Sequence, residues 1–168
     1  MSATMSKRPY TGIWPVAPTP FNADGSLDLE GMKRVLDLMI DQGVDGICIL
    51  ANFSEQFLLS DEEREVLTRL CLEHVAGRVP VIVTISHFAT QIVEARARLA
   101  ASLGASMLMM MPPYHGTGLR ADEVSVIEHF RAAGKAGGIP IMLQDAPLSG
   151  VQLTVGQIVR MAREVPEL

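Results

Sequence analysis

Short apolar runs alternate with longer amphipathic segments along the whole sequence. Five such runs begin about 27 to 34 residues apart, which is the length of one strand, one helix and two loops. The runs are continuous rather than alternating, as expected for strands that are buried on both faces of a parallel sheet. They cover residues 12–18, 46–51, 79–85, 106–111 and 139–143.

The segments between the runs have the start and stop signals of helices. Asp28 is a candidate N-cap, and the apolar residues after it recur at the three- and four-residue spacing of one buried helix face. Capping boxes begin further helices at Ser60 and Thr154, each followed three residues later by Glu or Gln. Two more helices are predicted near residues 90–103 and 122–136. The pattern therefore predicts an α/β fold with a parallel sheet.

Two α/β architectures fit this alternation, a doubly wound sheet and a (β/α)8 TIM barrel. A doubly wound sheet normally has a glycine-rich turn after its first strand, whereas the first run here leads into Pro-Thr-Pro-Phe at residues 18–21. A TIM barrel needs eight units and about 250 residues. We therefore interpret residues 1–11 as an N-terminal leader and residues 12–168 as an incomplete TIM barrel with about the first five βα units. A truncated barrel and a natural half-barrel both fit the sequence.

Composition and charge exclude several classes of protein. Apolar residues make up 48% and charged residues 20% of the chain, which is too apolar for a disordered protein. The net charge of −5 offers no basic surface for nucleic acid. No apolar run reaches the roughly 18 residues of a membrane span, and the first ten residues lack the apolar core of a signal peptide. We therefore expect a cytoplasmic protein without nucleic-acid or membrane partners, in which Cys48 and Cys71 are buried thiols.

Polar and aromatic residues follow the apolar runs with unusual regularity. In both architectures the carboxyl ends of the strands meet at one edge, where ligands bind. Ordinary turn chemistry explains any one such cluster, but five of them together favour a binding site. No His, Cys, Asp or Glu cluster has the spacing of metal ligands, so no metal is predicted. The clusters are residues 18–20, 52–56, 86–88, 112–116 and 144–147.

Three segments carry a resemblance to a known family. The opening has Gly12, then Val16 and Thr-Pro-Phe at residues 19–21, followed by Asp-Gly. Residues 52–55 lie where the family carries a G-T-T-G-E turn, and residues 113–115 lie where it carries P-Y-Y. In this order and spacing the chain resembles the dihydrodipicolinate synthase/N-acetylneuraminate lyase family. Within the family, the segments around these turns are most similar to dehydratases of 2-keto-3-deoxy sugar acids.

The resemblance implies a TIM-barrel lyase that acts on a small 2-keto acid and forms a homo-oligomer, a tetramer in the family. No separate cofactor is implied, since a lysine on the sixth strand forms an imine with the substrate. By register that strand begins beyond Leu168, whereas Lys7, Lys33 and Lys135 do not end predicted strands. The nucleophile is therefore expected outside these residues, and the 168-residue piece alone is expected to be inactive.

Substrate-binding residues are implied in the same way. Phe53 and Ser54, with the adjacent Asn52, match the turn that binds the substrate carboxylate, a task suited to backbone N–H groups and a hydroxyl. His115 aligns with a tyrosine that a neighbouring subunit supplies in many members. Asp145 either contacts a substrate hydroxyl or caps its own turn.

Three residues are candidates for catalysis. The family's aldolases have a tyrosine at the end of the fifth strand, where this chain has Gln144. An amide cannot be a general acid or base at neutral pH, although it can orient a hydroxyl or a water molecule. Tyr114 is retained. His87 suits proton transfer near neutral pH, and it fits equally well as a loop histidine bonded to the backbone.

The leading hypothesis is a lyase that forms an imine with a 2-keto-3-deoxy sugar acid and expels water. A pyruvate-dependent aldolase of the same family is an alternative, which Gln144 disfavours. A non-catalytic sugar-acid-binding or regulatory protein on the same scaffold is another, because a fold does not fix a function. A lysine at the end of the sixth strand would favour an enzyme.

Overall fold

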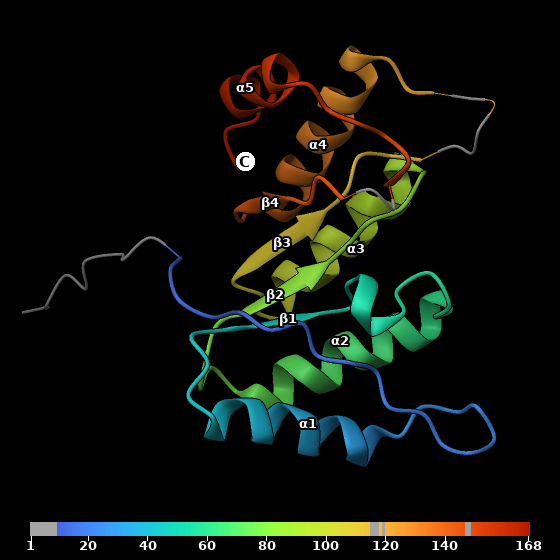
Figure 1. Cartoon of the computed structure of the whole chain (residues 1–168), viewed down its shortest axis with the longest axis vertical. Helices are drawn as coiled ribbons and strands as arrows, with labels where there is room; N and C mark the ends of the chain where they lie inside the picture. Colours follow the sequence, from blue (N-terminus) through green and yellow to red (C-terminus); the bar gives the residue numbers. More distant parts are fainter. Residues whose placement is uncertain (1–9, 115–117, 119, 147–148) are drawn as a thin grey trace, which may run out of the picture.

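The centre of the molecule is a four-stranded parallel sheet in the order β1-β2-β3-β4 (Figure 1). This computed structural model describes residues 10–114, 118, 120–146 and 149–168. Sequential order and parallel direction confirm the predicted α/β pattern, because parallel neighbours in one sheet must be joined by crossover segments. The strands are β1 (Ile47–Ile49), β2 (Val81–Thr84), β3 (Met107–Met110) and β4 (Ile141–Leu143).

The first apolar run is not a full strand, which corrects the prediction of five strands. It lies beside β1 and makes a single parallel bridge between Val16 and Cys48. The N–H of Ala17 donates to the Cys48 carbonyl at 2.9 Å, and the N–H of Cys48 donates to the Pro15 carbonyl at 2.9 Å. The ladder stays short because Pro15 and Pro18 have no backbone N–H to donate.

The described residues form five α-helices that alternate with the strands, and their N-termini are the ones that the sequence signals indicate. The side chains of Asp28 and Asp122 accept from backbone N–H groups in the first turns of their helices. Both predicted capping boxes, at Ser60 and Thr154, are formed. The helices are α1 (Leu29–Asp41), α2 (Asp61–Val75), α3 (Thr90–Ser102), α4 (Glu123–Gly137) and α5 (Val155–Glu164).

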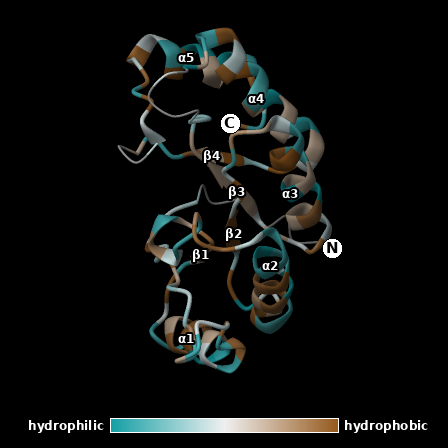
Figure 2. Cartoon of the chain, turned by 90° about the vertical axis from the view of Figure 1, so that its right-hand side faces the viewer, coloured by the Kyte–Doolittle hydropathy of each residue, from teal (hydrophilic) through white to brown (hydrophobic). Residues whose placement is uncertain are grey.

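The two faces of the sheet pack differently. One face, with the inner sides of the helices, forms the main core, in which Leu36, Leu108 and Phe130 are fully buried. Alternate strand residues point to the other face, as strand geometry requires. Figure 2 shows α2 and α3 on the same side of the strands, each with hydrophobic and hydrophilic portions. The opposite face forms a second cluster of Cys48, Ala51, Ile82, Met107 and Met109, packed against Trp14 and Val16.

Sulfur-containing side chains fill part of the core. Met107 and Met109 lie in the second apolar cluster and Met110 in the first. Cys48 and Cys71 are buried free thiols, as the sequence predicts. Burial raises the pKa of the Cys48 thiol to about 11, because the thiolate would lose its hydration.

Candidate active site at the carboxyl ends of the strands

A cavity of about 270 Å³ lies where β2 and β3 end. Both His87, which follows β2, and Tyr114, which follows β3, line it, so the structure brings these two predicted residues together. Asn52, Phe53, Ser54, Gln144 and Asp145 are not among its lining residues. The other residues that line the cavity are Phe57, Ser86, Phe88, Met111, Pro112 and Ser149.

The turn after β1 is a single 3-10 turn, η1 (Asn52–Ser54), between two residues in the left-handed conformation. Leu50 has φ of 58° and Glu55 has φ of 60°, and such a conformation costs a non-glycine residue about 1–2 kcal/mol. Strained backbone of this kind is concentrated at functional sites. The turn also reaches the end of β3, because the Asn52 amide contacts the Met111 sulfur at 3.7 Å.

Ser54 is almost completely buried, at 1% exposure, and its hydroxyl bonds within the chain. The hydroxyl donates to the Ala17 carbonyl at 2.6 Å and accepts from the Ala51 N–H at 3.1 Å. The Thr19 hydroxyl in turn donates to the Ser54 carbonyl at 2.8 Å. The geometry therefore assigns the Ser54 hydroxyl to holding the turn against the first run. A role of Ser54 in binding a substrate carboxylate stays a prediction.

Phe53 and Asn52 remain candidates for substrate contact. The Phe53 side chain is 71% exposed beside the strand ends. The side-chain oxygen of Asn52 accepts a hydrogen bond from the side-chain amide of Gln56, and this bond holds the turn closed. The substrate-binding role of the two residues stays a prediction. His115, the third residue expected near the substrate, lies outside the described residues.

His87 is held in one orientation by its own loop. Its Nδ1 accepts the Ala89 N–H at 2.9 Å, so a neutral ring carries its proton on Nε2. The pKa of His87 is lowered, first by burial and next by the positive charge of Arg96. The ring also stacks on Phe88 at 5.2 Å between centroids. His87 is thus both bonded to the backbone and placed in the cavity as a neutral imidazole.

Gln144 has an unsatisfied acceptor at the end of β4. Its backbone N–H donates to the Met110 carbonyl at 2.9 Å and so continues the sheet. The Oε1 atom of its side chain is buried and has no hydrogen-bond partner within the described part of the chain. Leaving a buried acceptor unpaired costs about 1–3 kcal/mol, and a substrate hydroxyl or a water molecule would remove that cost. Asp145, the next residue, is exposed.

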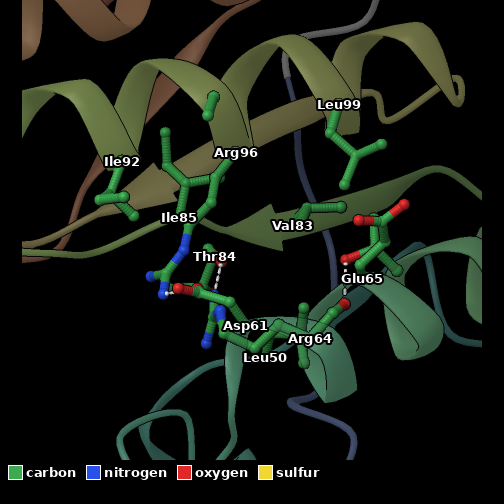
Figure 3. Close-up of a pocket in the computed structure, with 12 residues that line it drawn as sticks. Leu50, Asp61, Arg64, Glu65, Val83, Thr84, Ile85, Ile92, Arg96 and Leu99 are labelled. Atoms are coloured by element: carbon green, nitrogen blue, oxygen red, sulfur yellow. Dashed lines mark hydrogen bonds and ion pairs between the residues drawn. The ribbon is translucent and has the colours of Figure 1, made fainter.

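A second cavity, of about 310 Å³, lies between α2 and α3, away from the predicted site residues (Figure 3). Asp61 and Arg64 reach it from α2, and Arg96 reaches it from α3. Its lining contains no residue that follows β3 or β4. Although this cavity is the larger, the smaller one at the strand ends contains the residues suited to proton transfer, and we take that one as the candidate active site.

Sequence reasoning missed both arginines of this second cavity. Charged helix residues usually lie in solvent, but Arg64 is only 4% exposed. The signal was available, because Arg64 falls on the same face of α2 as the buried residues Leu67, Cys71 and Val75. No described segment places three or more His, Cys, Asp or Glu side chains together as a metal site. No described helix is long and apolar enough to span a membrane.

The parallel βα repeat, with a cavity at the carboxyl ends of the strands that His87 and Tyr114 line, defines part of a (β/α)8 barrel. A model of the dihydrodipicolinate synthetase family matches residues 9–168. The chain therefore belongs to this family, which confirms the resemblance drawn from its turns.

Individual relatives of known name belong to the same family. The chain is 55% identical over 166 residues to L-2-keto-3-deoxyarabonate dehydratase of Azospirillum brasilense, which covers 98% of this chain and 54% of that protein. It is 35% identical to 4-hydroxy-tetrahydrodipicolinate synthase of Stenotrophomonas maltophilia strain K279a, over 82% of this chain and 45% of that one. The chain thus spans about half the length of the curated relatives it matches.

A solved structure gives the same fold. A dihydrodipicolinic acid synthase family protein from E. coli K12, determined in complex with pyruvate, superposes with a TM-score of 0.89 at 30% identity. The match covers 95% of this chain and 53% of that structure. Together with the family match, this superposition supports the assignment of the chain to part of a TIM barrel.

Proposed function

We propose that the protein containing this chain is a Schiff-base lyase that dehydrates L-2-keto-3-deoxyarabonate to α-ketoglutaric semialdehyde. The observation that carries the proposal is the 55% identity to a dehydratase of that sugar acid over 98% of this chain. The other relative described above, a synthase, is 35% identical over 82% of the chain. The small-molecule partner is then a 2-keto acid, and the assembly is a homo-oligomer, a tetramer by resemblance to the family.

The chemistry follows from an imine at the keto carbon, formed by a lysine outside these 168 residues with loss of one water. The protonated imine makes the C3 protons acidic, because its nitrogen takes up the electron pair. The resulting enamine expels the C4 hydroxyl as water and leaves a C3=C4 double bond conjugated to the imine. Loss of a C5 proton and protonation at C3 then give an enol at C4 and C5, whose ketonisation forms the C5 aldehyde. Hydrolysis of the imine releases the semialdehyde and restores the lysine. No cofactor or metal is needed for these steps.

Gln144 favours dehydration over carbon–carbon cleavage. A retro-aldol step needs a base that removes the proton of the C4 hydroxyl, and a side-chain amide cannot take it. The unpaired Oε1 of Gln144 can instead accept a hydrogen bond from the substrate hydroxyl or from a water molecule. Neutral His87 and the phenol of Tyr114, both at the cavity, are the groups of this chain suited to hydrogen bonding with the departing water.

Product analysis tests the proposal in a protein of the relatives' full length that contains this chain. We expect L-2-keto-3-deoxyarabonate to give α-ketoglutaric semialdehyde without pyruvate. Pyruvate and glycolaldehyde as main products would show an aldolase instead. Binding of the sugar acid without turnover would show a non-catalytic binding protein.

A pair of variants makes the test specific to the site. Gln144→Ala is expected to lower kcat, whereas Gln91→Ala, on the exposed surface of α3, is expected to leave kcat unchanged. Borohydride with pyruvate should reduce an imine in the full-length protein and leave the 168-residue chain unmodified. An adduct on Lys33 or Lys135 would overturn the placement of the nucleophile outside this chain.

A further inference from the structure

Arg64 on α2 and Arg96 on α3 both bond to backbone carbonyls near the ends of β1 and β2. Figure 3 shows Arg64 beside Thr84 and Arg96 beside Asp61. The Arg64 guanidinium donates to the Gln56 carbonyl at 3.1 Å and to the Thr84 carbonyl at 2.6 Å. It thereby ties the turn after β1 to the end of β2. Because both acceptors belong to different strand ends, a single side chain fixes their separation.

Arg96 continues this connection one step nearer to the site. Its Nη1 donates to the Ser86 carbonyl at 2.6 Å, and its Nη2 donates to Oδ1 of Asp61 at 2.7 Å. The Ser86 hydroxyl then accepts the Met111 N–H at 3.0 Å, at the end of β3. Asp61 on α2 therefore holds Arg96 on α3, and Arg96 holds the residue that precedes His87.

The burial of these groups makes the contacts strong. Arg64 is 4% exposed and the side chain of Arg96 is 18% exposed. Bonds between a guanidinium and a carbonyl are charge-assisted, and they are stronger where water is excluded. The Nε atoms of both arginines are buried and have no hydrogen-bond partner among the described residues, so the guanidinium groups are held through their Nη atoms.

We propose that Arg96, held by Asp61, is a positioning residue that fixes the Ser86–His87 segment at the cavity formed by the ends of β2 and β3. Arg64 fixes the end of β2, from which this segment continues, through its bond to the Thr84 carbonyl. The effect on turnover rests on the proposed function, whereas the positioning itself is a property of this chain. Neither arginine lines the candidate active site, so both act through the loops that do.

The charges around His87 support this role. The charged groups that act on His87 are Arg96 on α3 and Asp61 and Arg64 on α2. Arg96 and Arg64 lower the pKa of His87, while Asp61 raises it. Removal of the Arg96 charge, and any loosening of the loop that hydrates the ring, both raise the His87 pKa. Arg96 therefore holds the segment that carries the imidazole and, after burial, contributes to the lowering of the His87 pKa.

Amide hydrogen exchange measured by NMR tests the positioning in the chain itself. The amides of Met111 and Ala89 report on the segment directly, since they donate to the Ser86 hydroxyl and to the His87 ring. In Arg96→Gln we expect exchange at these two amides to accelerate by about tenfold or more, while amides inside β2, such as Val83, keep their protection. Arg98→Gln, on the exposed side of α3, is the matched control and should change none of them.

The outcomes separate positioning from a merely structural role. Unchanged exchange at Met111 and Ala89 in Arg96→Gln would refute the proposal, and so would equal acceleration at Val83, which indicates general loosening. The His87 pKa, followed by ring chemical shifts, should rise in Arg96→Gln and stay near its original value in Arg96→Lys, which keeps the charge. An unaltered His87 pKa in Arg96→Gln would also contradict the proposal that Arg96 positions this segment.

Kinetics in the full-length protein then connect the segment to the reaction. We expect Arg96→Gln to lower kcat by about tenfold to a hundredfold with a smaller change in KM, as for a misplaced proton-transfer group. Arg98→Gln should match the parent enzyme. If the parent has no dehydratase activity, the proposed function fails, and the exchange experiment still decides whether Arg96 positions the segment.

Discussion

Replacing Ser54 with alanine should destabilise the chain through the turn that follows β1. The change removes one hydroxyl and leaves two buried backbone groups without their partner, the Ala17 carbonyl and the Ala51 N–H. Ala17 and Ala51 are 0% and 1% exposed, so water does not replace the lost bonds without opening the structure. Each such unpaired group costs about 1–3 kcal/mol.

The two losses are close together and do not add fully, so we expect a total of about 2–4 kcal/mol. In a chain of this length that corresponds to a decrease in Tm of roughly 5–15 °C. Urea unfolding followed by circular dichroism and by the fluorescence of Trp14, the single tryptophan, measures the free energy of unfolding directly.

Ser102→Ala is the matched control, because that exposed hydroxyl bonds only to the Leu99 carbonyl at the end of α3. It should change the free energy of unfolding by less than about 0.5 kcal/mol. A similarly small effect of Ser54→Ala would refute the structural role of its hydroxyl. That result would favour the predicted role of Ser54 in binding a substrate carboxylate instead.

Three further predictions concern other buried or charged groups. Cys48, whose pKa burial raises to about 11, should react with iodoacetamide near pH 8 only as fast as the chain unfolds. Gly46→Ala should destabilise by about 1–3 kcal/mol, since a Cβ there would overlap the Trp14 ring. Arg96 lowers the pKa of Asp61 below its ordinary 3.8, so the contribution of this pair to stability is complete above that value and is lost as the pH falls through the lower folded-state pKa.

Each of these three has its own check. Labelling of Cys48 at a rate independent of urea would show an open path to the thiol. Gly156→Ala, where a Cβ meets only the Thr154 hydroxyl at 3.9 Å, is the control for Gly46. Asp61→Asn should make the unfolding free energy less dependent on pH between about pH 2 and pH 5, and an identical dependence would contradict the assigned pair.

The sequence by itself determined the elements and their order. Capping residues such as Ser60 and Thr154 act on backbone groups only two or three residues away, so their effect is local and readable from the sequence. The continuous apolar runs likewise predict parallel strands, because only strands covered on both faces tolerate them. The turns that follow the strands were enough to indicate the family and to select His87 and Tyr114, which line one cavity.

Only the tertiary structure decided what individual polar groups bond to. The Ser54 hydroxyl turns toward Ala17, 37 residues away, and the Arg96 guanidinium reaches Asp61, 35 residues away. The first run makes one bridge instead of a strand, because its prolines interrupt the donors that a ladder needs. Partners so far apart in sequence leave no periodic signal, since they are chosen by how the packed helices and strands bring buried donors and acceptors together.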